Sequence, residues 1–571
     1  MAEINPCGKL SEAEQERLVA RRKTRRRVTI IALSSVLLVA VVVATVVGVT
    51  QTKDNKSKGN NQSISNSIKA VCNATLYPDS CYNSLAPLVK SGNVKPQDLY
   101  KLSVQIAINE LSKASQDFIE NGVKKLNITD QRTLDAIQTC QELFSLSLDH
   151  LNNSLSIKDT SLLEAFGDLR TWLSSAGTYQ QTCFDELEGA SNGLNILANE
   201  NFKNSTEYTS NSLAIITSID ESINSLGAIK RRRRLMSSGD ESPEWLGFKE
   251  RKLLQTPSSN IKADAVVAKD GTGKYKTISA ALKAVPNKSK KRFVIYVKRG
   301  VYFENVRVEK QKWNVMIIGD GSDRTIVSGG LNNVDGTPTF QSATFAVFGQ
   351  GFIARDMGFR NTAGPIKHQA VALMSTADLS VFYRCTFDAF QDTLYVHSNR
   401  QFYRECNIYG TVDFIFGNSA VVIQNSNIMP KKPMQGQQNT LTAQGRFDPN
   451  QNTGISIQNC TIVPGANLAG VNTFLGRPWK NYSTTVLFHN VMGGFIHPNG
   501  WMPWVGSSAP STIFYAEFQN LGAGAVTRNR VKWSGLKLNL NAAQVRKFTV
   551  GPFVNGDKWI PATGVSYKSG L

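Results

Sequence analysis

Apolar positions along the chain follow three successive patterns. Residues 28–49, VTIIALSSVLLVAVVVATVVGV, are almost continuously apolar and have no polar face. From about residue 62 to 226, apolar residues recur at three- and four-residue steps, the spacing of helices with one buried face. From residue 258 onward the apolar runs are short and are separated by Gly and Asn turns, which is typical of β-strands. The pattern predicts one long apolar helix, then a helical domain, then a β-rich domain.

The helical segment contains two clear apolar faces. The first is formed by Val104, Ala107, Ile108, Leu111, Ala114 and Phe118, and the second by Leu169, Trp172, Ala176, Tyr179, Cys183 and Leu187. Strand patterns are scarce, so residues 62–226 are predicted to form an antiparallel helical bundle. A Cys72–Cys81 bridge would clamp a helical hairpin, and a Cys140–Cys183 bridge would tie two helices together. Four cysteines allow three pairings, and this one is the hypothesis that we favour.

A short motif repeats in the β-rich segment. The copies are RDMGF at 355–359, RCTF at 384–387, ECNI at 405–408, NSNI at 425–428 and NCTI at 459–462. Each copy follows an apolar run, and the copies recur at roughly twenty to thirty residues with no helical period. The recurrence predicts that residues 258–571 form a solenoid of strands, a parallel β-helix. A β-sandwich or jelly roll is the alternative, but its hairpin turns and strict alternation are thin here.

The N-terminal pattern predicts the cellular route of the chain. Residues 1–27 end in a basic cluster, and the apolar run after them is predicted as a signal anchor over 28–50 that is long enough to span a bilayer. We expect the basic tail to stay in the cytosol, residues 51–61 to form a polar linker, and the remainder to enter the secretory lumen. Several N-x-[ST] glycosylation sequons and the paired cysteines agree with this route. The sequence thus predicts a membrane-anchored precursor and a secreted glycoprotein.

Residues 227–257, GAIKRRRRLMSSGDESPEWLGFKERKLLQTP, separate the helical and β-rich domains. A charged run is usually just a solvated surface. Here two basic clusters lie between different domains of a secreted chain, where exposed segments are also cut by processing proteases. We therefore expect cleavage near Arg234 or Leu254.

The charge of the chain favours an acidic partner. Its 571 residues carry a formal net charge of +20. No zinc-finger spacing, aromatic-basic RNA signature or heptad-basic region accompanies that charge, so nucleic acid is not the predicted partner. The five histidines show no metal-ligand spacing, and no GxSxG elbow occurs, so neither a metal nor a cofactor is predicted.

Two aspartates occupy equivalent places in the repeat. Asp392 follows Cys385 by seven residues, and Asp413 follows Cys406 by the same seven. If the two cysteines have the same position in successive coils, the aspartates share one column of the solenoid. Neighbouring coils are about 4.8 Å apart, so the two carboxyl groups are expected to lie within contact range.

Stacked carboxyl groups indicate a division of chemical roles. Two close carboxylates cannot both ionise cheaply, so one tends to keep a proton while the other acts as a base or nucleophile. Retaining glycosidases use such a pair, but the same pair can attack an ester and form an acyl-enzyme. Ester attack creates an oxyanion that needs neutral donors, and Gln391 and Gln369 are amides that can supply them. The amides favour an ester as the substrate.

Five motifs then identify a family that the chain resembles. They are GVYFE (300–304), QAVAL (369–373), QDTL (391–394), DFIFG (413–417) and LGRPW (475–479). Their order is typical of plant pectin methylesterases, and residues 258–571 resemble that catalytic domain throughout. Residues 62–226 resemble the pectin methylesterase inhibitor domain that precedes many of these enzymes. The resemblance implies a right-handed parallel β-helix catalytic domain preceded by an all-α inhibitor-like bundle.

The resemblance also implies an activity and the residues that perform it. The activity is hydrolysis of the methyl esters of homogalacturonan, the polymer of pectin, to pectate and methanol in the plant cell wall. Carried over by motif, Asp413 is the nucleophile. Asp392 is the proton donor and later activates the water that clears the acyl-enzyme. Gln391 stabilises the oxyanion with help from Gln369.

Further residues match substrate-binding positions of the resembled family. Arg477 of LGRPW would hold Asp413 ionised, and Trp479 of the same motif would stack on a sugar face. Thr339, in DGTPTFQSATF, matches a substrate-contact position. Simpler roles exist: Arg477 as a structural ion-pair partner, Trp479 as a core residue, and Thr339 and Gln369 as ladder residues of the solenoid.

The partners expected from the resemblance are pectin, the chain's own inhibitor-like domain, a separate pectin methylesterase inhibitor, and a subtilisin-like processing protease. The helical domain is expected to silence the enzyme, or to assist its folding, until cleavage. Two other functions compete: a polygalacturonase or lyase on the same solenoid, and a role of the helical domain as an inhibitor or wall-binding module.

One departure from the resembled family concerns Cys406. Its usual disulfide partner is replaced here by Ser426, so that bridge cannot form. Cys406 either bridges to Cys385 one coil away or is a free buried thiol, and Cys460 is expected to lie too many coils away.

Overall fold

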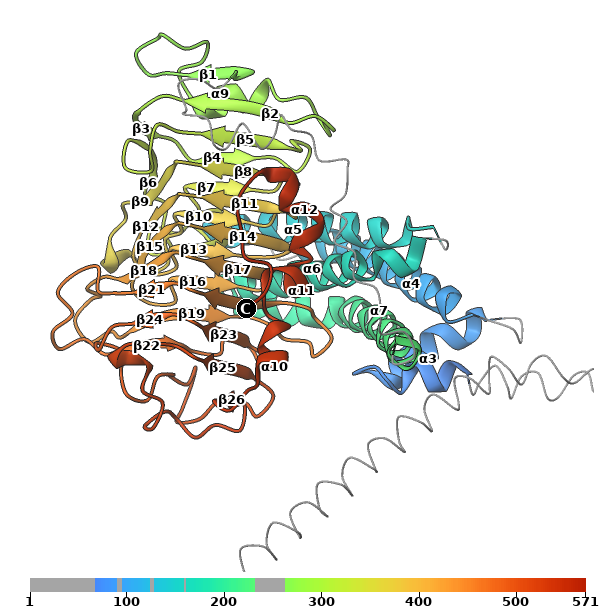
Figure 1. Cartoon of the computed structure of the whole chain (residues 1–571). Coiled ribbons are helices and arrows are strands. Elements are labelled where there is room, and N and C mark those ends of the chain that lie inside the picture. Colours follow the sequence, from blue (N-terminus) through green and yellow to red (C-terminus); the bar gives the residue numbers. More distant parts are fainter. Residues whose placement is uncertain (1–66, 90–94, 124–127, 159–160, 232–261) are drawn as a thin grey trace, which may run out of the picture.

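A bundle of helices lies beside a tall stack of parallel strands (Figure 1). The computed structural model describes residues 67–89, 95–123, 128–158, 161–231 and 262–571. The predicted cytosolic tail, signal anchor, polar linker and most of the processing segment lie outside the described residues. Within those ranges, no helix combines the length and the apolar character that crossing a membrane requires.

The helical domain is a bundle in which α5 packs along α6, and α7 packs along both α4 and α6. Its elements are α3 (Pro78–Leu85), η2 (Ala86–Leu88), α4 (Pro96–Asp117), η3 (Phe118–Gly122), α5 (Gln131–Leu155), α6 (Leu162–Ala190) and α7 (Asn192–Arg231). The Asp130 carboxylate accepts the Thr133 backbone N–H at 2.9 Å and caps the start of α5. Every residue of the two predicted apolar faces is buried except Trp172, which is half-buried. The predicted helical bundle is confirmed, and α7 continues beyond residue 226.

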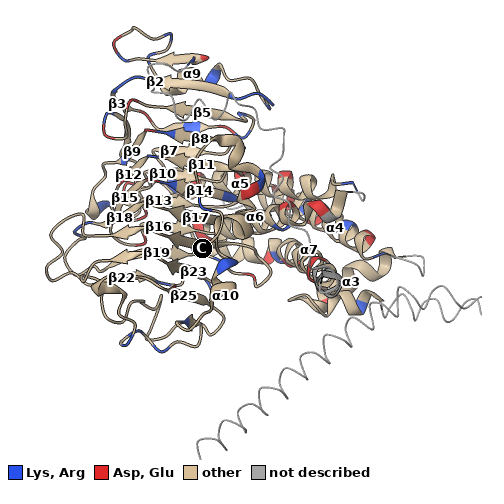
Figure 2. Ribbon diagram, viewed as in Figure 1, with Lys and Arg blue, Asp and Glu red and all other residues tan. Residues whose placement is uncertain are grey.

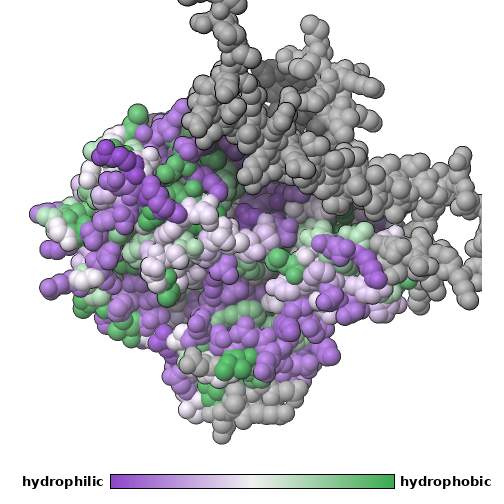
Figure 3. All heavy atoms as spheres, turned by 90° about the horizontal axis from the view of Figure 1, so that it is seen from below, coloured by the Kyte–Doolittle hydropathy of each residue, from purple (hydrophilic) through white to green (hydrophobic). Residues whose placement is uncertain are grey.

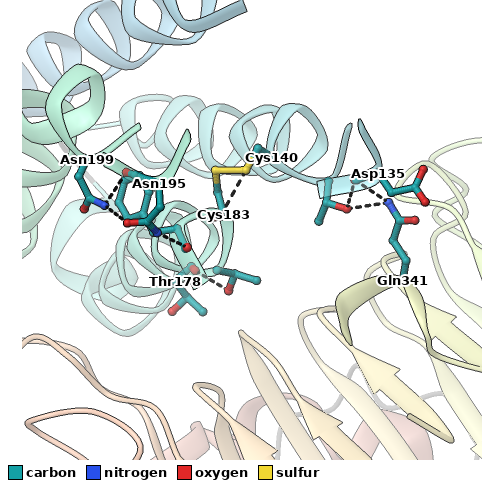
Figure 4. Close-up of a disulfide and its surroundings, with 10 residues drawn as sticks. Asp135, Cys140, Thr178, Cys183, Asn195, Asn199 and Gln341 are labelled. Atoms are coloured by element: carbon teal, nitrogen blue, oxygen red, sulfur yellow. Dashed lines mark hydrogen bonds between the residues drawn. A yellow bond between two sulfur atoms is a disulfide. The ribbon is translucent and has the colours of Figure 1, made fainter. Parts of the chain in front are cut away.

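Both predicted disulfides are present in the helical domain. Cys72 pairs with Cys81, and Cys140 pairs with Cys183 across α5 and α6, with Cα atoms 5.5 and 4.7 Å apart respectively. Figure 4 shows the second bridge and also a contact nearer the start of α5. There Gln341 of the β-rich domain donates to the backbone oxygen of Asp135 at 3.2 Å. The helix held by the bridge therefore also contacts the other domain.

Removing the two bridges is expected to have unequal effects on stability. The Cys140–Cys183 bridge closes a loop with a sequence separation of 43, whereas the Cys72–Cys81 separation is 9. Loop-closure entropy then assigns about 4 kcal/mol to the first bridge and about 3 kcal/mol to the second. We expect the Cys140→Ala/Cys183→Ala chain to lose more unfolding free energy than the Cys72→Ala/Cys81→Ala chain in urea titrations followed by circular dichroism. Equal losses would contradict this ranking.

The β-rich domain is built from three sheets in which all pairings between named strands are parallel. The first sheet contains β1 (Ala265–Val267), β2 (Phe293–Val297), β5 (Val315–Ile318), β8 (Ile353–Arg355), β11 (Ser380–Tyr383), β14 (Arg400–Arg404), β17 (Ala420–Gln424), β20 (Gly454–Gln458), β23 (Thr484–Phe488), β25 (Phe514–Phe518) and β26 (Leu536–Lys537). The second contains β4 (Val306–Val308), β7 (Phe345–Val347), β10 (Leu373–Ser375), β13 (Leu394–Val396), β16 (Ile415–Gly417), β19 (Asn439–Gln444) and β22 (Thr473–Gly476). The third contains β3 (Gly300–Phe303), β6 (Thr325–Gly329), β9 (Gly358–Asn361), β12 (Thr386–Asp388), β15 (Asn407–Gly410), β18 (Asn427–Pro430), β21 (Thr461–Ile462) and β24 (Val491–Met492). Successive coils visit the sheets in turn, which confirms the parallel β-helix and excludes the sandwich.

Short helices accompany the solenoid. They are α9 (Ile278–Lys283), which follows β1, and α10 (Ala542–Arg546), α11 (Val550–Val554) and α12 (Gly556–Trp559), which follow the last strand. The final segment returns along the first sheet, where Val550 and Val554 pack against its outer face together with Val422. This packing covers one outer face of the β-helix.

The repeat motifs mark a sharp corner between the first and third sheets. Arg384, Glu405, Asn425 and Asn459 all have positive φ, from 51° to 53°, at the same place in successive coils. A left-handed residue turns the chain within two residues, so the following strand can begin at once. The repeated motif is thus the signature of this corner.

The column after this corner contains three thiols and one hydroxyl. Cys385, Cys406, Ser426 and Cys460 directly precede residues paired in register, and the three cysteines are buried and free. Ser426 Oγ accepts the Cys406 backbone N–H at 3.1 Å, and the Cys460 sulfur accepts the Ser426 N–H at 3.4 Å. Cys406 is therefore the free buried thiol of the two alternatives, and Ser426 separates it from Cys460.

The helical domain covers the outer face of the second sheet. Outward-facing residues of successive strands are in register along this face: Ala346, Met374, Tyr395, Phe416 and Ala443. All are buried and belong to one apolar cluster with the core of the helical bundle. The two domains therefore share a continuous hydrophobic contact.

A polar network adds to this contact. The buried Tyr179 hydroxyl of α6 accepts from Thr376 at 3.0 Å, Asn399 at 3.1 Å and Ser398 at 3.2 Å. Arg400 binds Asp168 of the helical domain at 2.6 Å. Such buried groups are fully satisfied only while the domains are in contact, so the interface is specific as well as apolar.

Charge is divided between the two domains. Acidic side chains are frequent on α4, α5 and α7, whereas Lys and Arg are spread over the β-helix (Figure 2). On the face shown in Figure 3, hydrophilic residues predominate over the described surface, and apolar ones form small separate patches. The acidic helical domain thus lies against a basic β-helix.

Candidate active site

The two predicted aspartates occupy one column of the β-helix. Leu394 of β13 pairs with Ile415 of β16, and each aspartate precedes its paired residue by two positions. The Asp392 backbone N–H donates to the Val412 oxygen at 3.0 Å. Both aspartates have positive φ, 64° for Asp392 and 51° for Asp413. Left-handed backbone at non-glycine residues often marks functional sites, and neighbouring coils here bring two carboxyl groups to one place.

Asp413 is held by charged and polar donors. Arg477 donates from Nε to Oδ1 at 2.8 Å and from Nη2 to Oδ2 at 2.6 Å. The Thr440 hydroxyl donates to Oδ1 at 2.6 Å, and its oxygen accepts the Asp413 backbone N–H at 2.8 Å. A bidentate guanidinium stabilises the negative charge and fixes the orientation of the carboxylate. Asp413 is therefore suited to act as an ionised, oriented nucleophile.

Asp392 is in a different electrostatic environment. Its side chain is buried, and burial raises its pKa well above the ordinary value, with a further increase from the charge of Asp413. Glu186 of the helical domain acts in the same direction, and Arg477 opposes both. A carboxyl group in such surroundings keeps its proton near neutral pH. The pair therefore separates into a protonated Asp392 beside an Asp413 held by a guanidinium.

All the residues predicted from the sequence line one cavity. Its volume is about 480 Å³, and its walls contain both aspartates together with Gln391, Gln369, Thr339, Arg477 and Trp479. Residue 445 must be Gly for Trp479 to take its position, because a Cβ there would lie 2.8 Å from the indole ring. The solenoid thus brings together side chains from five separate segments of the sequence.

Trp504 and Lys480 are among the residues of this cavity that were not predicted from the sequence. Trp504 lies in a loop, and its ring is 4.2 Å from the Arg477 guanidinium and 6.4 Å from the Trp479 ring. Lys480 also lines the cavity, next to Trp479. Trp504 lies in an irregular segment outside the repeat. Lys480 directly follows the LGRPW motif but is not part of it, so the motif did not indicate a role for this lysine. Only the fold shows that they belong to the site.

The helical domain forms the opposite wall of the cavity. The wall comes mainly from the end of α6, with Asp185, Glu186 and Glu188 among its residues. Glu186 accepts the Phe340 backbone N–H at 2.9 Å, and Asp185 binds the Lys480 ammonium at 2.6 Å. The domain therefore closes one side of the cavity that contains the aspartate pair.

Protonation should control how tightly the helical domain holds this position. Burial raises the pKa of Glu186 from 4.5 to about 7, with Asp185 adding to the shift and Phe340 N–H and Arg132 opposing it. Docking then takes up a proton, and the contribution of Glu186 to docking affinity is expected to fall as pH rises from 4.5 through 7, by at most about three-hundredfold. Burial lowers the pKa of His397 from 6.5 to about 3, so docking also weakens as pH falls below 6.5. We expect the highest affinity between roughly pH 4.5 and 6.5.

This expectation is measurable on the chain cut between its domains, by titrating domain binding calorimetrically from pH 4 to pH 8. In the Glu186→Gln variant, the loss of affinity above pH 6.5 should disappear, and the loss on the acid side should remain. A variant with the same alkaline loss as the parent chain would contradict the assignment to Glu186.

Comparisons with known proteins agree in both halves of the chain. The family model described as Pectinesterase matches residues 264–557, and that described as Plant invertase/pectin methylesterase inhibitor matches residues 66–215. Pectinesterase 3 of Phaseolus vulgaris is 47% identical, over 99% of this chain and 98% of its own. Pectinesterase 1 of Arabidopsis thaliana is 48% identical, over 88% of this chain and 87% of its own.

A solved structure matches the β-helix. The pectin methylesterase from carrot is 51% identical and covers 55% of this chain and 99% of its own, with a TM-score of 0.53. The carrot chain therefore corresponds to the β-rich domain alone.

Proposed function

The chain belongs to the pectinesterase family and carries a fused inhibitor-like domain, and from this premise we propose that it hydrolyses the methyl esters of homogalacturonan through an aspartyl acyl-enzyme. The enzyme is a carboxylic ester hydrolase. One observation carries the mechanism: adjacent coils present a guanidinium-bound Asp413 and a buried Asp392 of raised pKa to the same cavity. An ionised carboxylate and a protonated acid are the two groups that this reaction needs.

The first half-reaction forms the acyl-enzyme. An Asp413 oxygen attacks the ester carbonyl carbon, and the carbonyl electrons move to its oxygen. The Gln391 amide, with help from Gln369, donates hydrogen bonds to that oxyanion. When the intermediate collapses, the bond to the methoxy oxygen breaks and Asp392 gives it a proton. Methanol leaves, and the sugar carbonyl remains bound to Asp413 as an anhydride.

The second half-reaction restores the enzyme. Asp392, now ionised, takes a proton from a water molecule as the water oxygen attacks the sugar carbonyl. The bond to Asp413 breaks and leaves Asp413 ionised, Asp392 is protonated again, and the galacturonic acid product loses its remaining proton to the solvent as it leaves as a carboxylate. Arg477 keeps Asp413 oriented through both steps, since it holds both carboxylate oxygens.

Aromatic and polar residues around the pair would hold the polymer. Trp479 offers a ring on which a sugar face can stack, and Thr339 contributes a further polar side chain to the cavity lining. The acidic product explains the basic character of the β-helix, because a pectin chain with free carboxylates is a polyanion.

The route to the cell wall is part of the same proposal. The apolar run 28–50 would direct the chain into the secretory pathway as an anchored precursor, and glycosylation would follow there. The basic clusters of residues 227–257 would be cut by a subtilisin-like protease, which releases the enzyme from its inhibitor-like domain. A separate inhibitor protein of the same kind could then take that domain's place.

Simultaneous measurement of methanol and viscosity tests the activity. The chain cut between its domains should release methanol from esterified pectin with no fall in viscosity. A fall in viscosity without methanol would instead indicate a polygalacturonase or lyase. No reaction at all would leave the helical domain as an inhibitor or wall-binding module.

A further inference from the structure

Lys480 is unusual among the cations that line the cavity. Arg477 donates to both oxygens of Asp413, so its ion-pair partner lies within the β-helix. Lys480 is the other basic side chain that the described β-helix contributes to this cavity. Its ammonium binds Asp185, a residue of the helical domain, at 2.6 Å. Removal of the helical domain therefore takes away this anionic partner.

Lys480 lies next to Trp479, whose ring is the proposed sugar-binding surface. Its Nζ atom lies 5.4 Å from the centroid of the Trp479 ring, and the side chain is 23% exposed even with the helical domain in place. Each unit of homogalacturonan carries one carboxyl group, either free or methylated. A unit bound near Trp479 therefore brings its carboxyl group within reach of the ammonium. Only the free, ionised form makes an ion pair with it.

We infer that Lys480 is a specificity-determining residue, which binds the free carboxylate of a galacturonate unit next to the ester under attack, and that Asp185 occupies that carboxylate's place in the precursor. The inference rests on the proposed function and names the substrate that the enzyme prefers: a polymer in which an acidic unit flanks an ester.

A second lysine, Lys310, provides a control that distinguishes substrate binding by Lys480 from simple contact between the domains. Lys310 binds Asp149 of the helical domain, also at 2.6 Å. It does not line the cavity. The two lysines therefore make ion pairs of the same N···O distance across the interface, but of the two only Lys480 lines the cavity of the aspartate pair. Lys310→Gln is thus the matched control for Lys480→Gln.

The experiment compares two defined substrates on the enzyme freed from its helical domain, a form that corresponds to the whole of the carrot protein. One oligogalacturonide is fully methylated, and the other carries free carboxylates beside its esters. We expect Lys480→Gln to lower kcat/KM for methanol release from the second substrate about fivefold, through KM, and to leave the first substrate unchanged. Lys480→Arg should retain the parent preference, Lys310→Gln should behave as the parent on both substrates, and high salt should reduce the preference of the parent enzyme.

Two results would overturn the inference. If Lys480→Gln matches the parent enzyme on both substrates, Lys480 serves only the domain contact. If it impairs both substrates equally, its role is structural. A parent enzyme that releases no methanol from either substrate would instead refute the proposed function, and this inference with it.

Discussion

Replacement of Asp413 by asparagine is expected to lower methanol release by about ten-thousandfold or more, with the fold retained. An amide cannot attack the ester carbonyl, so no acyl-enzyme forms. Asparagine has nearly the same shape as aspartate and can still accept hydrogen bonds from Arg477 and Thr440, so the surrounding loop should hold its position. The rate should be measured on the cut chain with esterified pectin under saturating conditions.

Asp378 provides a matched control for this variant. Its carboxylate binds Arg400 at 2.6 and 2.9 Å, and its side chain is 7% exposed, as is that of Asp413. Asp378→Asn removes the same kind of buried ion pair but lies outside the cavity. Both variants should lose thermal stability, since each removes a buried carboxylate charge from beside an arginine. Only Asp413→Asn should lose activity, and equal loss in the two variants would mean that Asp413 acts through stability alone.

Cleavage between the domains is expected to raise activity about a hundredfold or more at low protein concentration. The end of α6 lies over Asp392 and Asp413, so a polymer cannot reach them while the domain is docked. An uncut connection keeps the helical domain at an effective concentration in the millimolar range, and cutting removes that advantage. Methanol release should be measured before and after cutting at a specific protease site placed within residues 232–257.

The control for cleavage is a chain whose basic clusters are replaced and which lacks the introduced site. It should stay silent after the same protease treatment. An uncut chain that is as active as the cut one would contradict the silencing role and leave the helical domain with a function in folding.

The column that contains the two aspartates could be predicted because a solenoid repeats by position. Equal distances from Cys385 and Cys406 were enough to bring Asp392 and Asp413 together, and the register of β13 with β16 agrees. The apolar faces of the helical domain could also be predicted, because helical spacing decides which side chains face inward. The same spacing places Cys183 on a buried face, where it can form a disulfide with another helix. Local rules therefore accounted for both folds.

The contacts between the domains could not be predicted in the same way. Asp185 and Glu186 appear in the sequence as ordinary charged residues near a helix end. Their contacts with Lys480 and Phe340 exist only because the helical domain packs against the β-helix. Trp504 belongs to a loop whose path is set by tertiary packing. His397 belongs to no motif of the sequence, and in the fold it is buried against Thr182 of the helical domain. The role of a residue that acts through contact with a distant segment can be recognised only from the three-dimensional structure.

The identity of the covalent intermediate is the most direct test of the account. The cut enzyme, mixed with methyl-esterified oligogalacturonide during turnover, can be quenched rapidly into hydroxylamine, which converts an aspartyl anhydride into an aspartyl hydroxamate. Peptide mass spectrometry should then find the hydroxamate on Asp413. A hydroxamate on Asp392, or none on Asp413 in a sample that is releasing methanol, would contradict the assignment of Asp413 as the nucleophile.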